Sequence, residues 1–301
     1  MEKMSIDVFQ IAYDWIFNYQ IHSSFAAFLR VSVVSYFTFW VLFASHEIKV
    51  WSQPEGVFGI KTFMSSQVSG GVPLACFTFF EYIKNSKILR KCFFALFYLS
   101  SILAISGLIT NISLAIFTLC FISIQHRIYP VFMNNGNTIE KILLIFLTFV
   151  DCGSRYSLDE YFKISSNLDF VDGWGVRMIQ ISLPVIYFLS VQYKGEDLAW
   201  VRGGVLKMCV MSNAIMRSTG KYLYPYLIHS NRWILRAATK TALWFEYFAI
   251  PLFIFDATRP IALGYFMLMH FLILIFFKID HFGSTMMIAL LFYLNEYFLR
   301  I

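Results

Sequence analysis

The feature that most constrains this fold is a run of 34 residues, 92–125, that contains no charged side chain. A single helix of that length would be about 50 Å long, far more than the roughly 30 Å apolar core of a bilayer. The run therefore predicts a tight helical hairpin that crosses a membrane twice and turns near Thr110 and Asn111. The basic segment NSKILRK at 85–91 precedes the hairpin and is the clearest marker of a cytoplasmic side.

Composition extends this interpretation to the whole chain. Hydrophobic residues make up 58% and charged residues 14%, which excludes an ordinary soluble domain. The net charge of +6 fits basic cytoplasmic loops, and no basic block interleaved with aromatic residues indicates nucleic acid binding. The five cysteines lack C-x-x-C spacing, so we expect buried free thiols and no metal site. The N-terminus lacks a small-residue cleavage site, so we expect no cleaved signal peptide.

The pattern of apolar segments predicts an all-α polytopic membrane protein. We expect about eight transmembrane helices, within a range of about seven to nine, in one domain covering 1–301. Residues 1–22 would hold an interfacial amphipathic helix at 5–20, and residues 25–301 would form the bundle. The expected segments are a span at 25–45, a short helix at 141–150, a helix from 176 to about 194, an interfacial helix at 200–217, a hairpin of 241–256 and 260–277, and a last span at 284–299. Residues 62–80 are long enough to cross, and Gly70, Gly71 and Pro73 also allow a broken or re-entrant helix there.

Polar side chains recur every seven residues along the helix predicted after 176. Gln180, Tyr187 and Lys194 are spaced by seven, which places them on one stripe. Pro184 frees the carbonyl of Gln180 and predicts a kink. Lys194 has two interpretations: a lysine that reaches the headgroups, or a base whose pKa is lowered by dry surroundings.

The hairpin predicted near the C-terminus holds an acid and an imidazole. Glu246 lies 12 residues before Thr258 and His270 lies 12 after it, so both would sit at one depth in a straight hairpin. They could form a buried pair that moves a proton, or a polar clamp between two helices. Asp256 and Arg259 at the turn are interpreted as a local charge pair and a cap.

An amide-rich loop and the segment after it form a second polar group. Asn134, Asn135, Gly136 and Asn137 predict a turn. The residues Asp151, Arg155 and Asp159 are spaced by four, which favours a ladder of ion pairs on a helix surface. Alternatively, Arg155 and Tyr156 form one wall of a polar pocket at the membrane surface.

Three segments together resemble the HTTM membrane domain, shared by vitamin K-dependent γ-carboxylases and the sporulation-delaying-protein B (SdpB) family. They are MNNGNTIEKILLIFLTFVDCGSRYSLD at 133–159, QISLPVIYFLSVQYKGEDLAWVRGG at 180–204 and EYFAIPLFIFDATRPIALGYFMLMH at 246–270. They match an N-x-G loop with an R-Y-S-x-D ending, then Gln, Tyr-Phe, Lys, Trp and Gly, and then Glu, Pro, Arg and His.

The resemblance implies roles for particular residues. In the carboxylases the lysine of the second motif deprotonates reduced vitamin K, and a histidine of the third belongs to the same active site. The matching positions here are Lys194 and His270. Two features depart from the carboxylase pattern: no large domain follows the membrane part, and Val191 or Gln192 replaces a glycine. The length and the R-Y-S-L-D ending are closer to SdpB-like members, which act with a small partner, SdpA, to mature a secreted antimicrobial peptide.

The leading hypothesis is therefore an SdpB-like protein of the bacterial cytoplasmic membrane that matures an exported peptide toxin with an SdpA-like partner. The alternatives are a quinone-dependent oxidoreductase or carboxylase-like enzyme, and a non-enzymatic immunity or scaffold protein. The expected partners are membrane lipid and a toxin precursor. The expected catalytic residues are Lys194, His270 and Glu246, and the expected pocket residues are Gln180, Tyr187, Asn135, Arg155, Tyr156, Trp200 and Arg259. The side of the membrane that holds Lys194 stays open: eight basic residues in 194–240 favour the cytoplasm, and the carboxylase resemblance favours the other side.

Overall fold

The computed structural model describes residues 8–52, 79, 83, 86–128, 135–165, 167–212, 214–220, 222, 232–279 and 281–295. The helix predicted at 62–80 lies outside the described residues. The chain forms two compact units, unit 1 with residues 1–177 and 295–301, and unit 2 with residues 178–294.

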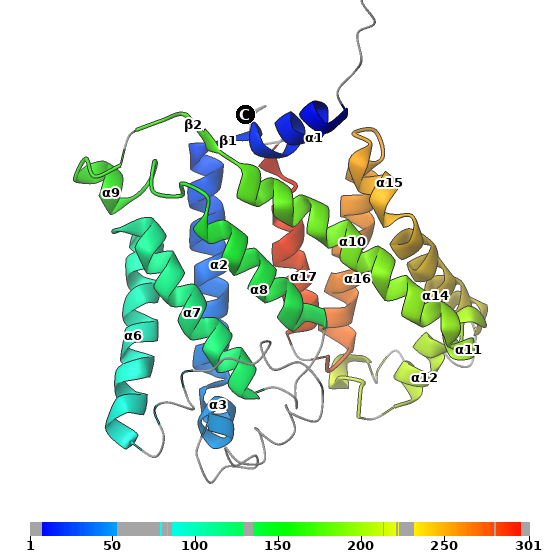
Figure 1. Ribbon diagram of the computed structural model, residues 1–301. Helices are drawn as coiled ribbons and strands as arrows, with labels where there is room; N and C mark the ends of the chain where they lie inside the picture. Colours follow the sequence, from blue (N-terminus) through cyan, green and yellow to red (C-terminus); the bar gives the residue numbers. More distant parts are fainter. Residues whose placement is uncertain are drawn as a thin grey trace, which may run out of the picture. The chain divides into compact units, whose positions relative to one another are not determined.

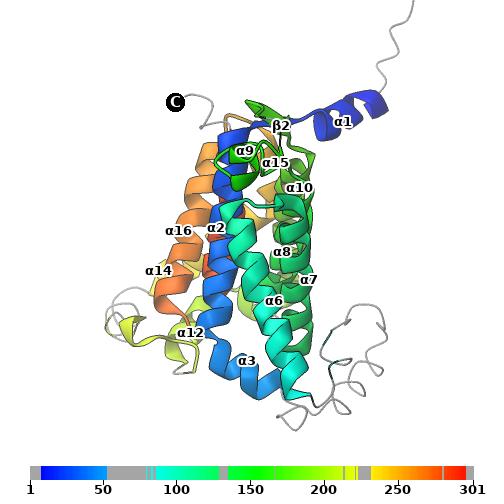
Figure 2. The same ribbon diagram turned by 90° about the vertical axis from the view of Figure 1, so that its left-hand side faces the viewer.

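Unit 1 is built from long helices with a small two-stranded sheet at one end (Figures 1 and 2). Its elements are α1 (Val8–Phe17), β1 (Gln20–His22), α2 (Ser23–Phe43), α3 (Ser45–Ser52), α6 (Lys87–Ser106), α7 (Thr110–Ile128), α8 (Asn135–Thr148), α9 (Leu158–Tyr161), β2 (Phe170–Asp172) and the start of α10 (Trp174–Glu196). The strands pair antiparallel, with Ile21 opposite Val171.

The hairpin predicted at 92–125 is present as α6 and α7, which pack side by side (Figure 2). The turn lies at Gly107–Ile109, where Gly107 closes α6 with a φ of 71°. A left-handed residue of this kind ends many helices, and glycine adopts it at the lowest cost. The first span and the N-terminal helix are likewise found where they were predicted, as α2 and α1.

The described part of the amide-rich segment, residues 135–137, belongs to a helix rather than to a turn, and Asn134 lies outside the described residues. Helix α8 begins at Asn135, six residues before the predicted start at 141, and it ends at Thr148. Buried side chains on its first turns account for this extension. Ile139 is 2% exposed and Glu140 is fully buried, so the packing of these turns outweighs the turn preference of the amides.

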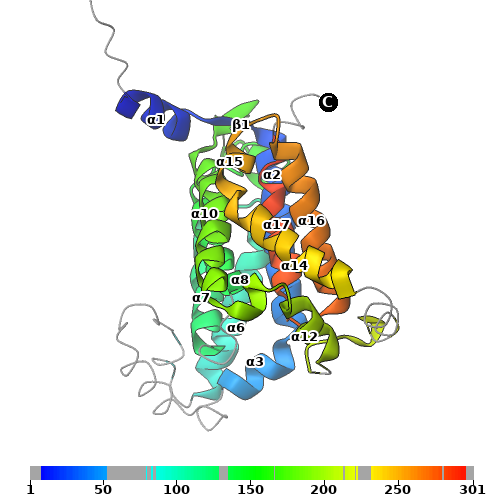
Figure 3. The same ribbon diagram turned by 90° about the vertical axis from the view of Figure 1, so that its right-hand side faces the viewer.

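Unit 2 contains the rest of α10 and the helices that follow it (Figures 1 and 3). These are α11 (Leu198–Val201), α12 (Val205–Met211), α14 (Arg232–Tyr247), α15 (Ala249–Ile254), α16 (Arg259–Phe276) and α17 (Phe282–Leu291). The helix predicted at 200–217 is interrupted after Val201, because Gly203 adopts a φ of 74° and reverses the chain between α11 and α12.

The predicted hairpin of 241–256 and 260–277 is correct in its second arm and wrong in its first. The first arm begins earlier, at Arg232, and is broken at Phe248 into α14 and α15. Pro251 explains the break, since it has no amide hydrogen to donate to the carbonyl of Tyr247.

Five of the described helices are long and apolar enough to cross a membrane: α2, α6, α7, α10 and α16. Helices α8, α14 and α17 are shorter, with 14, 16 and 10 residues. The structure is therefore all-α in its spanning part, and the total of eight spans stays a prediction.

Candidate functional site

The three polar side chains predicted to share a stripe of α10 do so, and each contacts a different segment of unit 2. Gln180 donates to the carbonyl of Phe292, at the end of α17 (Nε2 to O, 2.8 Å). Tyr187 contacts α16 and Lys194 contacts α14. The heptad spacing thus makes α10 the helix to which three other segments are attached.

Pro184 lies inside α10 without ending it. The carbonyl of Gln180, which loses its helical donor to this proline, accepts a hydrogen bond from the hydroxyl of Tyr293. A buried carbonyl without a donor is costly, so the tyrosine stabilises the helix at this point. Tyr293, which is 4% exposed, is a residue that the sequence interpretation missed.

Tyr187 and His270 form a buried polar pair. The Tyr187 hydroxyl lies 2.7 Å from Nε2 of His270, and the two residues are 4% and 1% exposed. The tyrosine ring stacks on Phe266 with centroids 4.1 Å apart, which fixes the direction of its hydroxyl. Nδ1 of His270 is buried and has no hydrogen-bond partner among the described residues.

Lys194 and Glu246 form a charged pair at the end of α10. The ammonium lies 2.6 Å and 2.5 Å from the two carboxylate oxygens. The lysine side chain is 23% exposed and that of the glutamate 7%. The ring of Trp200 lies 4.8 Å from the ammonium and contributes a cation–π contact. Trp200 therefore belongs to the Lys194 group, as its place in the motif implied.

The direct pair expected between Glu246 and His270 does not form. Glu246 binds Lys194 instead, and His270 binds Tyr187. Glu246 and His270 would lie at one depth only if the helix from Glu246 to the turn were straight. The break at Phe248 interrupts that helix, so the two side chains do not meet. Two pairs, one ionic and one neutral, replace the predicted one.

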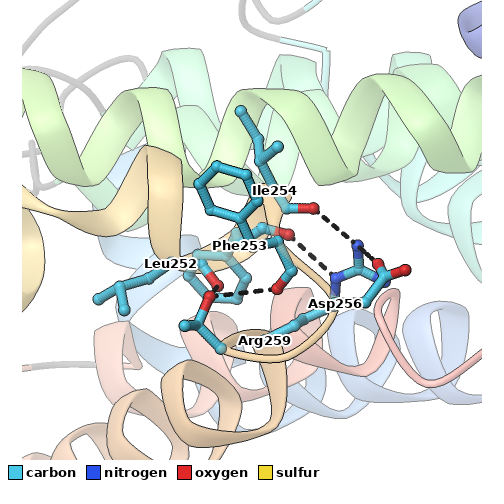
Figure 4. A network of polar contacts seen from close by, with 7 residues as sticks. Leu252, Phe253, Ile254, Asp256 and Arg259 are labelled. Carbon is cyan, nitrogen blue, oxygen red and sulfur yellow. Dashed lines mark hydrogen bonds and ion pairs between the residues drawn. The ribbon is translucent and has the colours of Figure 1, made fainter.

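Arg259 stabilises the chain between α15 and α16 rather than facing a ligand (Figure 4). Its guanidinium donates to the carbonyls of Phe253 and Ile254, at 2.9 Å and 3.2 Å, and lies 2.6 Å from a carboxylate oxygen of Asp256. These bonds satisfy carbonyls at the end of α15. The predicted charge pair and cap are confirmed. The guanidinium donors that make these bonds are not open for a substrate.

The predicted ion-pair ladder of Asp151, Arg155 and Asp159 is wrong, because residues 149–157 are not helical. Asp151 accepts from the hydroxyl of Ser154, and Arg155 pairs with Asp169 at 2.9 Å. Asp159 accepts three bonds from the start of α7: the amides of Ile109 and Thr110 and the hydroxyl of Thr110. The carboxylate therefore caps α7 and complements its N-terminal partial charge.

The R-Y-S-L-D motif is thus mainly a structural one in this chain. Arg155 and Tyr156 are near neighbours, with the guanidinium 6.0 Å from the ring centroid, and the tyrosine side chain is 70% exposed. The side chain of Ser157 caps α9 by accepting from the amide of Glu160 at 2.9 Å. The pocket wall proposed for Arg155 and Tyr156 remains a prediction.

Arg30 is the residue of unit 1 that the sequence interpretation undervalued. It is fully buried in α2 and donates to the carbonyls of Cys152 and Tyr156, at 2.5 Å and 2.6 Å. A Cβ at Gly107 would lie 2.6 Å from the guanidinium, so glycine is needed there for space as well as for its backbone angle. An arginine inside an apolar span is rare, and that rarity was the available signal.

Unit 1 also holds a buried amide–acid contact that no motif predicted. Gln125 of α7 donates to Glu140 of α8, and both side chains are buried. At the next residue of each helix, Nζ of Lys141 lies 3.4 Å from Nε2 of His126. These contacts join the end of α7 to the start of α8. For Asn135, the structure describes its place in α8 but not its side chain.

These features define a polytopic helical membrane protein with paired polar side chains buried among its helices. A family model for the HTTM domain matches residues 64–297, which is 234 of the 301 residues. The chain therefore belongs to the HTTM domain family. No curated protein and no solved structure matches the chain.

Proposed function

We propose that this HTTM protein takes part in the post-translational maturation of an exported antimicrobial peptide in the bacterial cytoplasmic membrane, together with a small SdpA-like partner protein. The observation that carries the proposal is the Lys194–Glu246 pair, held at 2.5–2.6 Å at the end of a membrane helix. Membership of the HTTM family and the SdpB-like motifs support it.

The pair can move a proton without creating net charge. Transfer from the ammonium of Lys194 to the carboxylate of Glu246 gives a neutral amine and a neutral acid. In surroundings that exclude water this exchange avoids the cost of isolating a charge. The neutral amine can then take a proton from a substrate group, and the acid can return one. Trp200 contacts the ammonium form of Lys194 and so positions the side chain before the exchange.

The buried Tyr187–His270 pair supports this group from about two turns earlier on α10. Its hydrogen bond fixes the imidazole, so that Nδ1 is directed into the protein interior without a partner among the described residues. A buried nitrogen of this kind can accept or donate one hydrogen bond to a substrate.

We derive no step through a quinone. His270 offers one nitrogen without a partner among the described residues, and the ammonium of Lys194 is bound to both oxygens of Glu246, but no observed contact points to a quinone ring between them.

The masses of secreted peptides test the proposal. Cells that carry the intact chain, a deletion, Lys194→Ala or Lys278→Ala are compared at equal protein level. Lys278 is exposed and has no role in the pair, so Lys278→Ala is the matched control. We expect a peptide whose mass changes in the deletion and in Lys194→Ala but not in the control. Identical masses in all four strains would exclude a covalent modification.

A second candidate function is a non-enzymatic scaffold or immunity protein. One observation favours it: Gln180, Tyr187 and Lys194 all have partners on other helices, as residues that only clamp a bundle would. This function predicts that cells expressing the chain alone survive the toxin. It also predicts that Lys194→Met combined with Glu246→Gln leaves that protection intact.

A further inference from the structure

The outer face of α14 carries a stripe of aromatic and basic side chains. Trp233, Arg236, Lys240, Trp244 and Tyr247 follow one another at intervals of three or four residues, so they share one side of the helix. All five are exposed, with the two tryptophans at 68% and 61%. We call these five residues the α14 stripe.

The opposite side of α14 faces the interior of unit 2. It carries Leu235, Thr239 and Glu246, which are 6%, 0% and 5% exposed. The helix therefore presents Glu246 of the ion pair inward and the α14 stripe outward. Two of its residues also contact neighbouring elements: the ring centroid of Tyr247 lies 5.9 Å from that of Phe188 on α10, and Arg236 packs against Gly203.

The stripe begins at the end of unit 2 where α10 and α16 finish. A buried cluster of Val210, Met216, Leu235 and Phe277 joins α12, the start of α14 and the end of α16 there. Main-chain bonds between Arg217 and Phe276 and between Lys278 and Ile215 close the same end. Figures 1 and 3 show α12, the first turn of α14 and the last turn of α16 together at this end.

Basic residues are concentrated at this end. Among the described residues of unit 2, those at or near it are Lys194, Arg202, Lys207, Arg217, Arg236, Lys240 and Lys278. At the other end, about 27 Å away along the 18 residues of α16, the basic residue of the described part of unit 2 is Arg259, which is paired with Asp256 as Lys194 is with Glu246. An excess of Lys and Arg marks the cytoplasmic side of a membrane protein.

We infer that the α14 stripe binds the anionic headgroups of the cytoplasmic leaflet. Tryptophan and tyrosine prefer the boundary between headgroups and acyl chains, and basic side chains extend past them to the phosphates. The cytoplasmic leaflet is the one whose negative surface attracts such residues. The stripe combines both kinds of side chain on the exposed side of α14.

Lipid binding by the α14 stripe is a property beyond the proposed function. It also rests on that function in one respect, since it assigns a side of the membrane to the proposed site. It locates the Lys194–Glu246 pair on the cytoplasmic side, where a peptide would meet it before export. Because Glu246 lies on the same helix as the stripe, lipid bound outside also holds the position of the carboxylate inside.

Lipid titration of the purified full-length chain tests the stripe without any activity assay. Native mass spectrometry in detergent measures binding of dioleoyl-phosphatidylglycerol and of dioleoyl-phosphatidylcholine. The variant Arg236→Gln/Lys240→Gln should bind phosphatidylglycerol roughly 25-fold more weakly, from about fivefold for each basic residue lost. The control Arg202→Gln/Lys278→Gln removes the same charge from the same end but not from the stripe, and it should lose clearly less phosphatidylglycerol binding than the stripe variant.

Three outcomes would overturn the lipid assignment. The first is equal binding of phosphatidylglycerol and phosphatidylcholine, and the second is an equal loss of phosphatidylglycerol binding in both double variants. The third is competition by a poly-glutamate peptide as effective as that by phosphatidylglycerol, which would make the stripe a site for acidic peptides. If Arg236→Gln/Lys240→Gln does not fold, the charge-conserving variant Arg236→Lys/Lys240→Arg must retain the preference for phosphatidylglycerol, and its loss would contradict the assignment.

Sidedness is tested separately in cells. A cysteine in place of Arg202 should react with a membrane-impermeant maleimide only after the cells are opened, with the unmodified chain as background. A cysteine in place of Ala257, which is exposed at the other end, should react in intact cells. The reverse pattern would place the α14 stripe on the outer side and refute the inference, whatever the outcome for the proposed function.

Discussion

Removing one partner of the Lys194–Glu246 pair should cost far more stability than removing both. Glu246→Gln leaves an ammonium that is 23% exposed without its counter-charge, and Lys194→Met leaves a carboxylate that is 7% exposed. Breaking a buried pair in this way costs about 3–5 kcal/mol. The lysine retains some access to water, so we expect about 3 kcal/mol for Glu246→Gln and a value nearer about 5 kcal/mol for Lys194→Met.

The double variant Lys194→Met/Glu246→Gln contains no isolated charge. Replacing a buried pair by neutral groups of similar volume is often nearly neutral, so the double variant should lie within about 1 kcal/mol of the parent. The three variants therefore form a cycle with a coupling energy of several kcal/mol, well above the roughly 0.5–3 kcal/mol of ordinary neighbouring residues.

The assay is reversible unfolding of the purified chain in mixed micelles of mild detergent and dodecyl sulfate, followed by circular dichroism. The exposed pair of Arg155 and Asp169, whose side chains are 33% and 75% exposed, provides the control cycle and should give less than about 1 kcal/mol. Additive effects at Lys194 and Glu246, or single variants as stable as the parent, would refute the view that this is a buried, mutually dependent pair.

The remaining predictions concern unit 1. Arg30→Met should lower the free energy of unfolding by roughly 3–6 kcal/mol, since two carbonyls lose charge-assisted bonds of about 1.5–3 kcal/mol each, and a change within about 0.5 kcal/mol would contradict this role. Asp159→Ala should cost about 2 kcal/mol by removing the cap of α7, measured in the same unfolding assay, whereas an unchanged midpoint would exclude capping. Burial raises the pKa of the Cys152 thiol to about 12, so the thiolate is scarce below that pH, and iodoacetamide at pH 9 should modify Cys152 only after unfolding. Rapid modification of Cys152 in the folded chain would show that the segment around it opens.

The sequence predicted those features that depend only on segment length and helical periodicity. The uncharged run at 92–125 can be satisfied only by two crossings, and the hairpin of α6 and α7 followed from its length. The heptad of Gln180, Tyr187 and Lys194 placed three side chains on one stripe because helical periodicity does not depend on the rest of the fold.

Partners across the fold could not be predicted in this way. The spacing of Asp151, Arg155 and Asp159 by four predicted that they lie on one side of a helix. The segment does not form one helix, and Asp159 instead caps α7 at Thr110, which lies 49 residues earlier in the sequence. Such a cap depends on tertiary packing, and no local pattern indicates it. Arg30 likewise binds carbonyls more than 120 residues away.

The site shows the same division. The polar residues themselves were found from the cost of placing them in a membrane, but their partners were not. Equal distance from Thr258 suggested that Glu246 would meet His270. Pro251 breaks the intervening helix, and the carboxylate of Glu246 pairs with Lys194 instead. The hydroxyl of Tyr293 donates to the Gln180 carbonyl that Pro184 leaves without a helical donor, and only the structure revealed this contact.

The measurement that tests the central claim most directly is the mass of the secreted peptide made with the charge-swapped chain, Lys194→Glu/Glu246→Lys. The swap preserves an ion pair between α10 and α14 but moves the amine to the other helix. If the pair performs chemistry, the peptide should have the mass seen in the deletion strain, although the chain is present at its normal level. A peptide of the mature mass would show that the two residues serve only to join the helices.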